Sequence, residues 1–230
     1  MYRMKHNTIK LSMIMASAIA LASCGGGVKS TDSKDADSAA KAGAGAQSYQ
    51  VDVTKSSVKW KGSSTLGYAH TGTMSIKSGS LMMEGAALKA GKFIVDMTSI
   101  KCEDLTDAEK NKKLIAHLSD TDFFAVSKFP EAVFEITGIS AAPADSLGNN
   151  SIVEGNLTLK NVTRNISFPA KVVANGNQVT AEGKAVINRL DWGVNYKRDQ
   201  ASLAEKAMMA IKDGVVKKEI EIGFNITALK

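Results

Sequence analysis

Residues 153–172, which read Val-Glu-Gly-Asn-Leu-Thr-Leu-Lys-Asn-Val-Thr-Arg-Asn-Ile-Ser-Phe-Pro-Ala-Lys-Val, decide the fold class. Apolar and polar residues alternate along both halves of this stretch, which is typical of β-strands with one buried and one solvated face. Asn161-Val162 separates the two halves, and asparagine favours turns because it tolerates a left-handed backbone. Such alternation indicates antiparallel strands, since parallel strands buried on both faces are apolar throughout.

The same alternation extends over residues 48–230 and predicts at least eight strands. An up-and-down antiparallel barrel of about eight strands would bury their apolar faces and remove the exposed sheet edges. A sandwich of two sheets would bury the same faces, so the alternation leaves both architectures open. The further alternating apolar residues are Val58, Trp60, Met74, Ile76, Phe93, Val95, Met97, Ala132, Phe134, Ile136, Val179, Ala181, Ala185, Ile187, Ile220, Ile222, Phe224 and Ile226.

Two segments have a helical pattern instead. Thr106-Asp107-Ala108-Glu109 is a capping-box sequence, with Thr106 as the N-cap and Glu109 at the third helical position. We expect a helix from about Asp107 to Leu118 and a second helix over Leu203–Ile211, because each segment carries an apolar stripe at helical spacing. The expected class is therefore all-β with one or two short helices.

Composition narrows the class of protein. The chain has 230 residues, of which 44% are hydrophobic and 23% are charged. These fractions are near the average for soluble globular proteins and exclude collagen-like, coiled-coil and wholly disordered chains. The formal charge is +6, but Arg3, Lys5 and Lys10 supply three of the positive charges within residues 1–23. The remaining surplus gives no electrostatic reason to expect nucleic acid as a partner.

The N-terminus has the parts of a secretory signal in the usual order: basic residues, the apolar run Leu11–Ala22, then small residues. As a helix that run would be about 18 Å long, which is too short to cross a hydrocarbon core of about 30 Å. Leu21-Ala22-Ser23-Cys24-Gly25 resembles the bacterial lipobox, and the resemblance implies cleavage before Cys24 and acylation of that residue. The alternative is an ordinary signal peptide with a chance cysteine beside it.

We therefore divide the chain into a lipoprotein signal peptide (1–23), an acylated Cys24 with a flexible tether (24–47) and one barrel domain (48–230). Residues 25–47 are mostly Gly, Ala, Ser, Lys and Asp, so they cannot order themselves by burying apolar surface. Gly25 stands where lipoproteins retained in the inner membrane have Asp, and no acidic run of the kind that directs some lipoproteins to the cell surface follows. We expect a lipid-anchored protein of the cell envelope, on the periplasmic side of the outer membrane.

Several motifs then follow one another along the predicted barrel. His117-Leu118-Ser119 precedes Asp122-Phe123-Phe124 and Lys128-Phe129-Pro130, and these are followed by Gly155-Asn156-Leu157-Thr158 and Asn188-Arg189-Leu190-Asp191-Trp192-Gly193. Together they resemble the YceI-like family. The resemblance implies an extended lipocalin-like barrel whose apolar interior holds a polyisoprenoid or a similar long-chain amphiphile, in a periplasmic or secreted protein.

The predicted interior could be hollow or solid, since an eight-stranded barrel is wide enough either to be filled by side chains or to hold one small ligand. Ala132, Gly155, Ala181 and Gly183 lie among bulky residues and would leave a groove for a thin chain, unless the large and small residues interlock. The expected ligand-binding residues of the barrel interior and mouth are Trp60, Met74, Phe93, Val95, Phe123, Phe124, Phe134, Leu157, Phe168, Arg189, Trp192 and Phe224.

Some of these residues have a second interpretation. Phe123 and Phe124 follow the first helix and either line a ligand entrance or seal the core. Arg189 and Trp192, with Asp191, could clamp a polar headgroup; the alternative is an Arg–Asp pair on a turn, worth at most about 1 kcal/mol if exposed.

We expect no catalytic residues, cofactor or metal. Beyond residue 23 the only histidines are His70 and His117, far apart and without the short spacing of paired metal ligands. The chain has neither a Gly-x-Ser-x-Gly elbow nor a Gly-rich phosphate loop. Cys102 has no disulfide partner if Cys24 is acylated, and we interpret it as a small buried residue rather than a nucleophile.

The expected function is non-enzymatic binding, storage or transport of a polyisoprenoid or similar long-chain amphiphile. The alternative is an envelope module with a solid barrel core that binds another protein. No feature of the sequence identifies such a protein partner.

Overall fold

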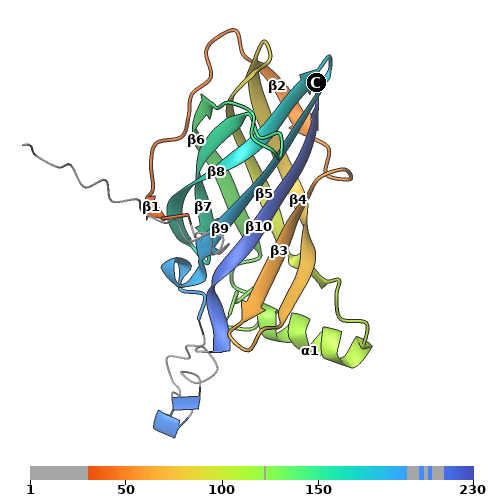
Figure 1. Cartoon of the computed structure of the whole chain (residues 1–230), viewed down its shortest axis with the longest axis vertical. Coiled ribbons are helices and arrows are strands. Elements are labelled where there is room, and N and C mark those ends of the chain that lie inside the picture. The colour runs from red at the N-terminus through yellow and green to blue at the C-terminus, as the bar shows by residue number, and fades with distance from the viewer. Residues whose placement is uncertain (1–30, 122, 196–201, 205–206, 209–214) are drawn as a thin grey trace, which may run out of the picture.

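A closed antiparallel barrel forms the body of the computed structural model, which describes residues 31–121, 123–195, 202–204, 207–208 and 215–230 (Figure 1). Each barrel strand pairs with the next along the chain, and the last pairs with the first, so that Phe224 lies opposite Val58. Closure excludes the two-sheet sandwich and confirms the predicted barrel. The eight strands are β3 (Ser57–Ser64), β4 (Ala69–Glu84), β5 (Ala87–Cys102), β6 (Glu131–Ala141), β7 (Ser151–Leu159), β8 (Val162–Asn175), β9 (Gln178–Asn188) and β10 (Val216–Leu229).

The strand–turn–strand prediction for residues 153–172 is confirmed in β7 and β8. Val153 lies opposite Phe168 and Gly155 opposite Ile166, and the apolar members of both strands are buried. The turn is one residue earlier than expected. Lys160 and Asn161 have positive φ values of 47° and 63°, as the two central residues of a tight hairpin turn require.

A short additional strand completes the wall at one end. Strand β2 (Gln47–Val51) pairs with both β4 and β10, at the end of the barrel where β3 does not reach. Strands β2 and β3 thus both lie between β4 and β10, each along a different part of these two strands. Figure 1 shows β2 at the end of the barrel opposite to α1.

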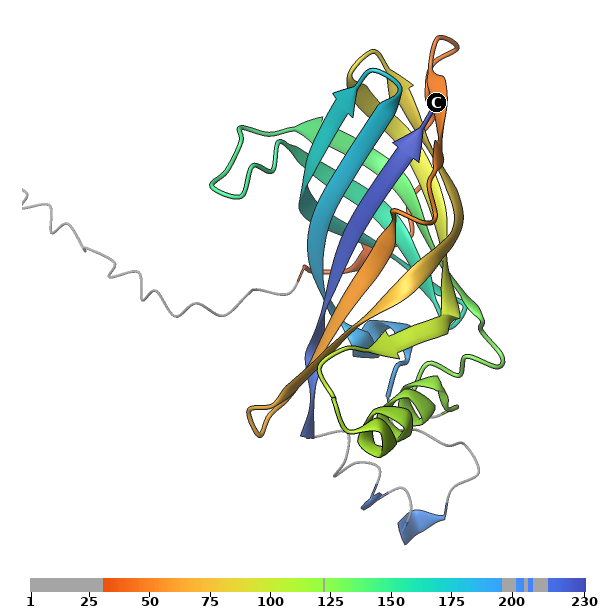
Figure 2. The same cartoon turned by 90° about the vertical axis from the view of Figure 1, so that its right-hand side faces the viewer.

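The first expected helix is present as α1 (Ala108–Ser119), which lies across one end of the barrel (Figure 2). Its N-cap is Asp107 and not Thr106, because the Asp107 carboxylate accepts a hydrogen bond from the Lys110 amide at 2.9 Å. The second expected helix, Leu203–Ile211, includes residues outside the described part of the chain, so that prediction stays open. Among the described residues, none of the helices combines the length and apolar character needed to cross a membrane.

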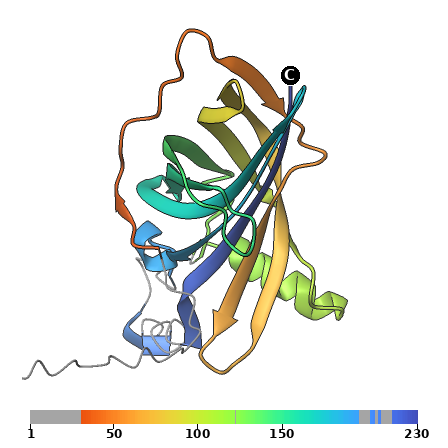
Figure 3. The ribbon, with the colours of Figure 1, turned by 45° about the horizontal axis from the view of Figure 1, so that its top comes forward.

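Residues 31–46 correct the prediction of a flexible tether. This N-terminal strap starts near the short helix η1 (Arg189–Trp192) and runs along the outside of the barrel toward β2 (Figure 3). It contains β1 (Lys34–Asp35), which pairs with β8. Its amides reach successive strands: Thr31 donates to the Val186 carbonyl at 2.7 Å and Ala40 to the Ile136 carbonyl at 2.9 Å.

The strap is held in place by hydrogen bonds and not by the burial of apolar side chains. Its fixed path along the barrel therefore could not be predicted from its composition. The Asn156 side chain both donates to the Asp37 carbonyl at 2.6 Å and accepts from the Asp37 amide at 3.0 Å. Glu84 accepts from the Gly43 amide at 2.6 Å. The proposed signal peptide and Cys24 lie outside the described residues, so lipidation stays a prediction.

Candidate functional site

An apolar cavity of about 190 Å³ lies inside the barrel at the α1 end. Strand residues line its wall, and α1 covers it with Leu114 and Leu118. Lys61, Tyr68 and His70 are partly or largely exposed and bring polar atoms to its edge. An apolar interior with a polar edge is the usual arrangement for binding an amphiphile with its tail inward. The buried apolar strand residues of the wall are Met74, Met97, Ile100, Leu159, Ile220 and Ile222.

The segment after α1 completes the cover. Phe123 and Phe124 both line the cavity, and their rings meet edge to face with centroids 5.0 Å apart. The Phe124 amide donates to the Leu118 carbonyl at 3.1 Å and the Val126 amide to the Ser119 carbonyl at 3.0 Å. These bonds hold the two rings close to the end of the helix. The two rings thus line the cavity beside α1, and the expectation that they line a ligand entrance stays a prediction.

An aromatic layer fills the middle of the barrel. Its members are the four buried rings of Phe93, Phe134, Phe168 and Phe224, and neighbouring rings have centroids 5.2–5.7 Å apart. Glycines on the intervening strands make room for it. A Cβ on Gly155 would lie 2.3 Å from the Phe134 ring, and one on Gly183 would lie 2.7 Å from the Phe168 ring. The space beside Gly155 and Gly183, which was expected to form part of a groove, is therefore occupied by aromatic rings, and the interlocked alternative holds in this layer.

The aromatic layer lies beyond the cavity and separates it from a second void, although none of its four rings lines the cavity. Along β10, Ile222 lines the cavity, Phe224 belongs to the layer, and Ile226 lines a separate void of about 30 Å³ beyond it. Along β5, Met97 lines the cavity while Phe93 lies in the layer and Leu88 lines the void. The interior is thus hollow at the α1 end and almost completely filled from its middle onward.

The structure divides the residues expected to bind ligand into three groups. Trp60, Met74, Phe123 and Phe124 line the cavity. Phe93, Phe134, Phe168 and Phe224 form the aromatic layer, and Val95 and Leu157 are buried in the core without lining the cavity. The third group is Arg189 and Trp192.

Arg189 and Trp192 do not form the expected headgroup clamp, because both are buried in and around η1 (Arg189–Trp192), with 1% and 0% of their surface exposed. The Arg189 guanidinium donates to the carbonyls of Val194, Val216 and Lys217 at 2.6–3.1 Å. Trp192 donates to the Leu157 carbonyl at 2.9 Å. Their role is structural: they fasten η1 to the barrel, and Arg189 lies behind the cavity wall, 5.9 Å from the Phe123 ring centroid.

Several cavity residues were not among those expected, although the sequence contained a signal for most of them. Met97, Ile220 and Ile222 lie on the same alternating faces as predicted neighbours, and Leu114 and Leu118 lie on the apolar stripe of the predicted helix. These signals were not specific enough to place them among the expected ligand-binding residues. Tyr68 follows a turn outside any periodic segment, and the sequence contains no signal for it.

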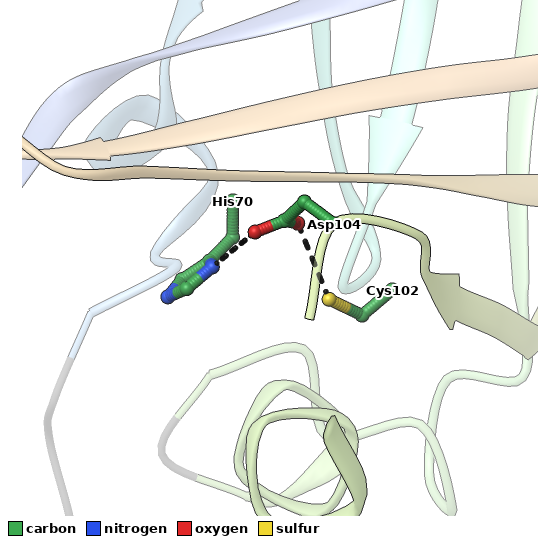
Figure 4. A group of neighbouring side chains, drawn as sticks. All are labelled: His70, Cys102 and Asp104. Carbon is green, nitrogen blue, oxygen red and sulfur yellow. Dashed lines mark hydrogen bonds and ion pairs between the residues drawn. The ribbon is translucent and has the colours of Figure 1, made fainter. Parts of the chain in front are cut away.

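Three potential metal ligands, which the sequence did not lead us to expect, lie together beside the cavity (Figure 4). His70 is on β4, Cys102 ends β5, and Asp104 follows it. One Asp104 oxygen lies 2.8 Å from His70 Nδ1, and the other accepts from the Cys102 thiol at 3.4 Å and from the Thr71 amide at 2.7 Å. His70 also lines the cavity. We call these three residues the rim cluster.

The rim cluster alters the acidity of its members. Partial burial acts to raise the pKa of the Asp104 carboxyl, but the hydrogen bonds from Thr71, His70 and Cys102 outweigh it and lower the pKa from 3.8 to about 2. Burial raises the pKa of the Cys102 thiol, and the neighbouring Asp104 carboxylate adds to this effect. Asp104 is therefore a carboxylate at neutral pH, while Cys102 keeps its proton.

Comparisons with known proteins agree with the barrel. A UPF0312 protein of Pseudomonas aeruginosa (strain LESB58) is 30% identical over 115 residues, which are 47% of this chain and 56% of that relative. A UPF0312 protein of Azotobacter vinelandii is 29% identical over 146 residues, which are 60% of this chain and 71% of that relative. This chain thus spans little more than half the length of the Pseudomonas protein.

Two solved structures share the fold. BcnA of Burkholderia cenocepacia has a TM-score of 0.56 and 24% identity, with coverage of 77% of this chain and 99% of BcnA. A polyisoprenoid binding domain from Saccharophagus degradans has a TM-score of 0.52 and 12% identity, with coverage of 79% and 97%. Residues 49–228 match the YceI-like domain, a span that begins in β2 and ends in β10. Because this match covers nearly the whole barrel, the chain belongs to the YceI-like family.

Proposed function

We propose that this protein binds the apolar tail of an amphiphile in the cavity at the α1 end and releases it unchanged, with no covalent step. The observation that carries the proposal is the cavity itself, whose wall is almost entirely apolar side chains and whose edge brings Lys61, Tyr68 and His70 toward solvent. The tail would pack against the wall while a polar headgroup stays at this edge.

The cavity volume limits how much of a tail can enter. A dry protein cavity of about 150 Å³ is large enough for benzene, so the 190 Å³ found here corresponds to a tail on the order of eight carbons, or between one and two prenyl units. Burying about eight carbons would contribute roughly 6 kcal/mol relative to water. The gain relative to a lipid bilayer would be close to zero, which suits a carrier that must also release its ligand.

A short polyisoprenoid is the first ligand class to test, since the similarly folded Saccharophagus degradans domain is named for polyisoprenoid binding. A longer chain would keep its remaining prenyl units outside the cavity unless the aromatic layer moved. The lipobox-like sequence ending at Cys24 supports acylation and a place in the cell envelope, facing the periplasm, where binding would serve storage or transport.

The test is a binding titration with geraniol, which has two prenyl units, and farnesol, which has three, followed by calorimetry. We expect binding of geraniol to the unmodified protein and much weaker binding to Leu114→Trp, because the indole would enter the cavity from α1. Ile115→Trp is the matched control. Ile115 is also half-buried on α1 but does not line the cavity, so this variant should bind as the unmodified protein does.

Two outcomes would count against the proposal. If neither alcohol binds and lipid extraction of the protein from its own organism yields no adduct, the cavity has no ligand role and the solid-core interaction module is favoured. The aromatic layer, which already makes half of the interior solid, is the observation behind that second candidate. Equal loss of binding in Leu114→Trp and Ile115→Trp would mean that the effect is not due to filling the cavity.

A further inference from the structure

The rim cluster combines three kinds of donor atom that bind the same class of ion. Cys102 supplies sulfur, His70 supplies an imidazole nitrogen and Asp104 supplies a carboxylate oxygen. Thiolate ligands favour zinc and other thiophilic metals, whereas calcium and magnesium prefer sites made of oxygen alone. Zinc sites with three protein ligands keep a fourth position for water or another small ligand.

The distances within the cluster are compatible with one small ion. The three ligand atoms lie within 4.8 Å of one another, and Asp104 oxygens are already 2.8 Å from His70 Nδ1 and 3.4 Å from Cys102 Sγ. With zinc–sulfur and zinc–nitrogen bonds of about 2.3 and 2.1 Å, two ligands of a tetrahedral ion lie about 3.5 Å apart. Side-chain rotations that move these atoms by about 1 Å would therefore bring all three into coordination distance.

The backbone around the cluster is held by hydrogen bonds that do not involve the ligand atoms needed for the metal. The Glu103 amide donates to the Thr71 carbonyl at 2.9 Å, which joins the end of β5 to β4. The Asn111 side chain on α1 donates to the carbonyls of Cys102 and Leu105, both at 3.0 Å. These bonds fix the backbone that carries Cys102 and Asp104, so that their side chains start from defined positions.

We propose that His70, Cys102 and Asp104 bind one Zn²⁺ ion, with a fourth coordination position open to solvent beside the cavity. The ion has a path of entry because the side chains of His70 and Asp104 are 34% and 31% exposed. This proposal is independent of the tail-binding function, since it rests on the cluster and not on the cavity volume.

Binding requires the thiolate form of Cys102. The S–H bond breaks as the S–Zn bond forms, and the proton passes to solvent, so one thiol proton is released for each ion bound. Zinc affinity should therefore increase as the pH rises from 6 to 8.

The experiment is a titration of the metal-free protein with Co²⁺, a spectroscopic substitute for Zn²⁺. We expect a thiolate-to-cobalt charge-transfer band that saturates at one ion per chain and disappears when Zn²⁺ is added. Cys102→Ser should abolish the band, and His70→Gln and Asp104→Asn should each weaken binding about tenfold or more, since each removes a ligand.

Two variants serve as controls. Glu103→Gln removes a neighbouring carboxylate that instead accepts a hydrogen bond from Thr73 at 2.8 Å, and it should leave cobalt binding unchanged. Cys24→Ser removes the other cysteine of the chain and should also retain the band. In case a ligand variant fails to fold, alkylation of the unmodified protein with peptide mapping gives a second readout, in which Zn²⁺ should protect Cys102.

The proposal is overturned if no band forms at one equivalent of Co²⁺, or if Zn²⁺ does not slow the alkylation of Cys102. It is also overturned if the band persists in Cys102→Ser or is lost in Cys24→Ser, because the sulfur ligand would then be a different residue. Geraniol binding provides no test of it, so the failure of one proposal leaves the other standing.

Discussion

The two halves of the barrel have the same alternating pattern, but one half has a hollow interior and the other a filled one. At the α1 end, Met74, Met97 and Ile222 face a cavity of about 190 Å³. Beyond the aromatic layer the remaining void is only about 30 Å³. The difference lies in the intervening strands, where Gly155 and Gly183 let phenylalanine rings cross the interior. Alternation therefore predicts which residues face inward, whereas the sizes of residues on neighbouring strands decide whether the interior is hollow.

The largest expected effect concerns the filled half. Phe134→Ala removes a ring that is 2% exposed and contacts Phe93, Phe168 and Phe224. We expect the free energy of unfolding to fall by about 3–5 kcal/mol, as for other large-to-small changes in packed cores. Urea denaturation measures this loss. Phe124→Ala removes a half-buried ring from the cavity wall and should lower the free energy of unfolding by clearly less. Equal losses in the two variants would contradict the difference in packing between the two halves.

The second prediction compares one glycine from each half. Gly155→Ala places a Cβ 2.3 Å from the Phe134 ring, and displacing that ring should cost about 1–3 kcal/mol. Gly62→Ala, on a cavity-lining strand, meets no atom within 4 Å and should change the free energy of unfolding by less than about 0.5 kcal/mol. Thermal and urea unfolding of the pair check the prediction. If Gly155→Ala were neutral, the layer would be looser than the ring contacts indicate.

The third prediction tests whether the aromatic layer limits tail length. Phe224→Leu keeps the residue apolar but shortens it, so the cavity should extend toward the void. Each further methylene that becomes buried would add about 0.8 kcal/mol, or about fourfold in affinity, and farnesol should gain relative to geraniol. Ile226→Leu, on the far side of the layer, should leave the ratio of the two affinities unchanged. A ratio that is also unchanged in Phe224→Leu would contradict the role of the layer as a barrier between the cavity and the void.

The smallest expected effect is electrostatic and lies on the outer face at the cavity end. Glu221 forms ion pairs with Lys184 and, at 3.0 Å, with Lys61, and these partners lower its pKa below 4.5, Lys184 most strongly. A carboxyl with a lowered pKa stabilises the fold above its unfolded pKa, and that contribution is lost as the pH falls through the lower, folded value. Glu221→Gln should therefore cost about 0.3–1 kcal/mol at pH 7.

Urea midpoints measured between pH 7 and pH 3 check this prediction. The difference between the unmodified protein and Glu221→Gln should narrow as the pH decreases below about 4.5. A difference that stays constant with pH would show that the cost comes from packing or hydrogen bonding and not from charge.

Much of the fold could be predicted because it depends on local pattern. The buried face of β7 and β8 and the helix after Asp107 follow from periodicity and capping. The strap could not be predicted, because its order comes from hydrogen bonds to distant partners such as Asn156 and Ile136 rather than from its own composition. The prediction for Arg189 was wrong: it was expected to clamp a headgroup or to pair with Asp191 on a turn, yet its guanidinium donates to three carbonyls in the interior.

The candidate site was predicted less completely than the fold. The alternating pattern identifies Trp60 and Met74 as inward-facing. It also identifies Phe93 and Phe134, which fill the middle of the barrel and do not line the cavity. The rim cluster depends on how β4 pairs with the end of β5, and irregularities in that pairing near Thr73 are not visible in the sequence. Long-range register, rather than residue type, limits prediction here.

The strap has a geometric consequence for a protein attached through Cys24. If all 22 residues between Cys24 and β2 were free, they could extend up to about 80 Å. Because the strap joins the barrel wall at Thr31, the reach is at most about 25 Å. Thr31 bonds to Val186, which lies opposite Glu221 at the height of the cavity wall. An acyl anchor on Cys24 would therefore attach the side of the barrel to the membrane through a short segment. This would keep the mouth of the cavity close to the lipid surface from which a tail would enter.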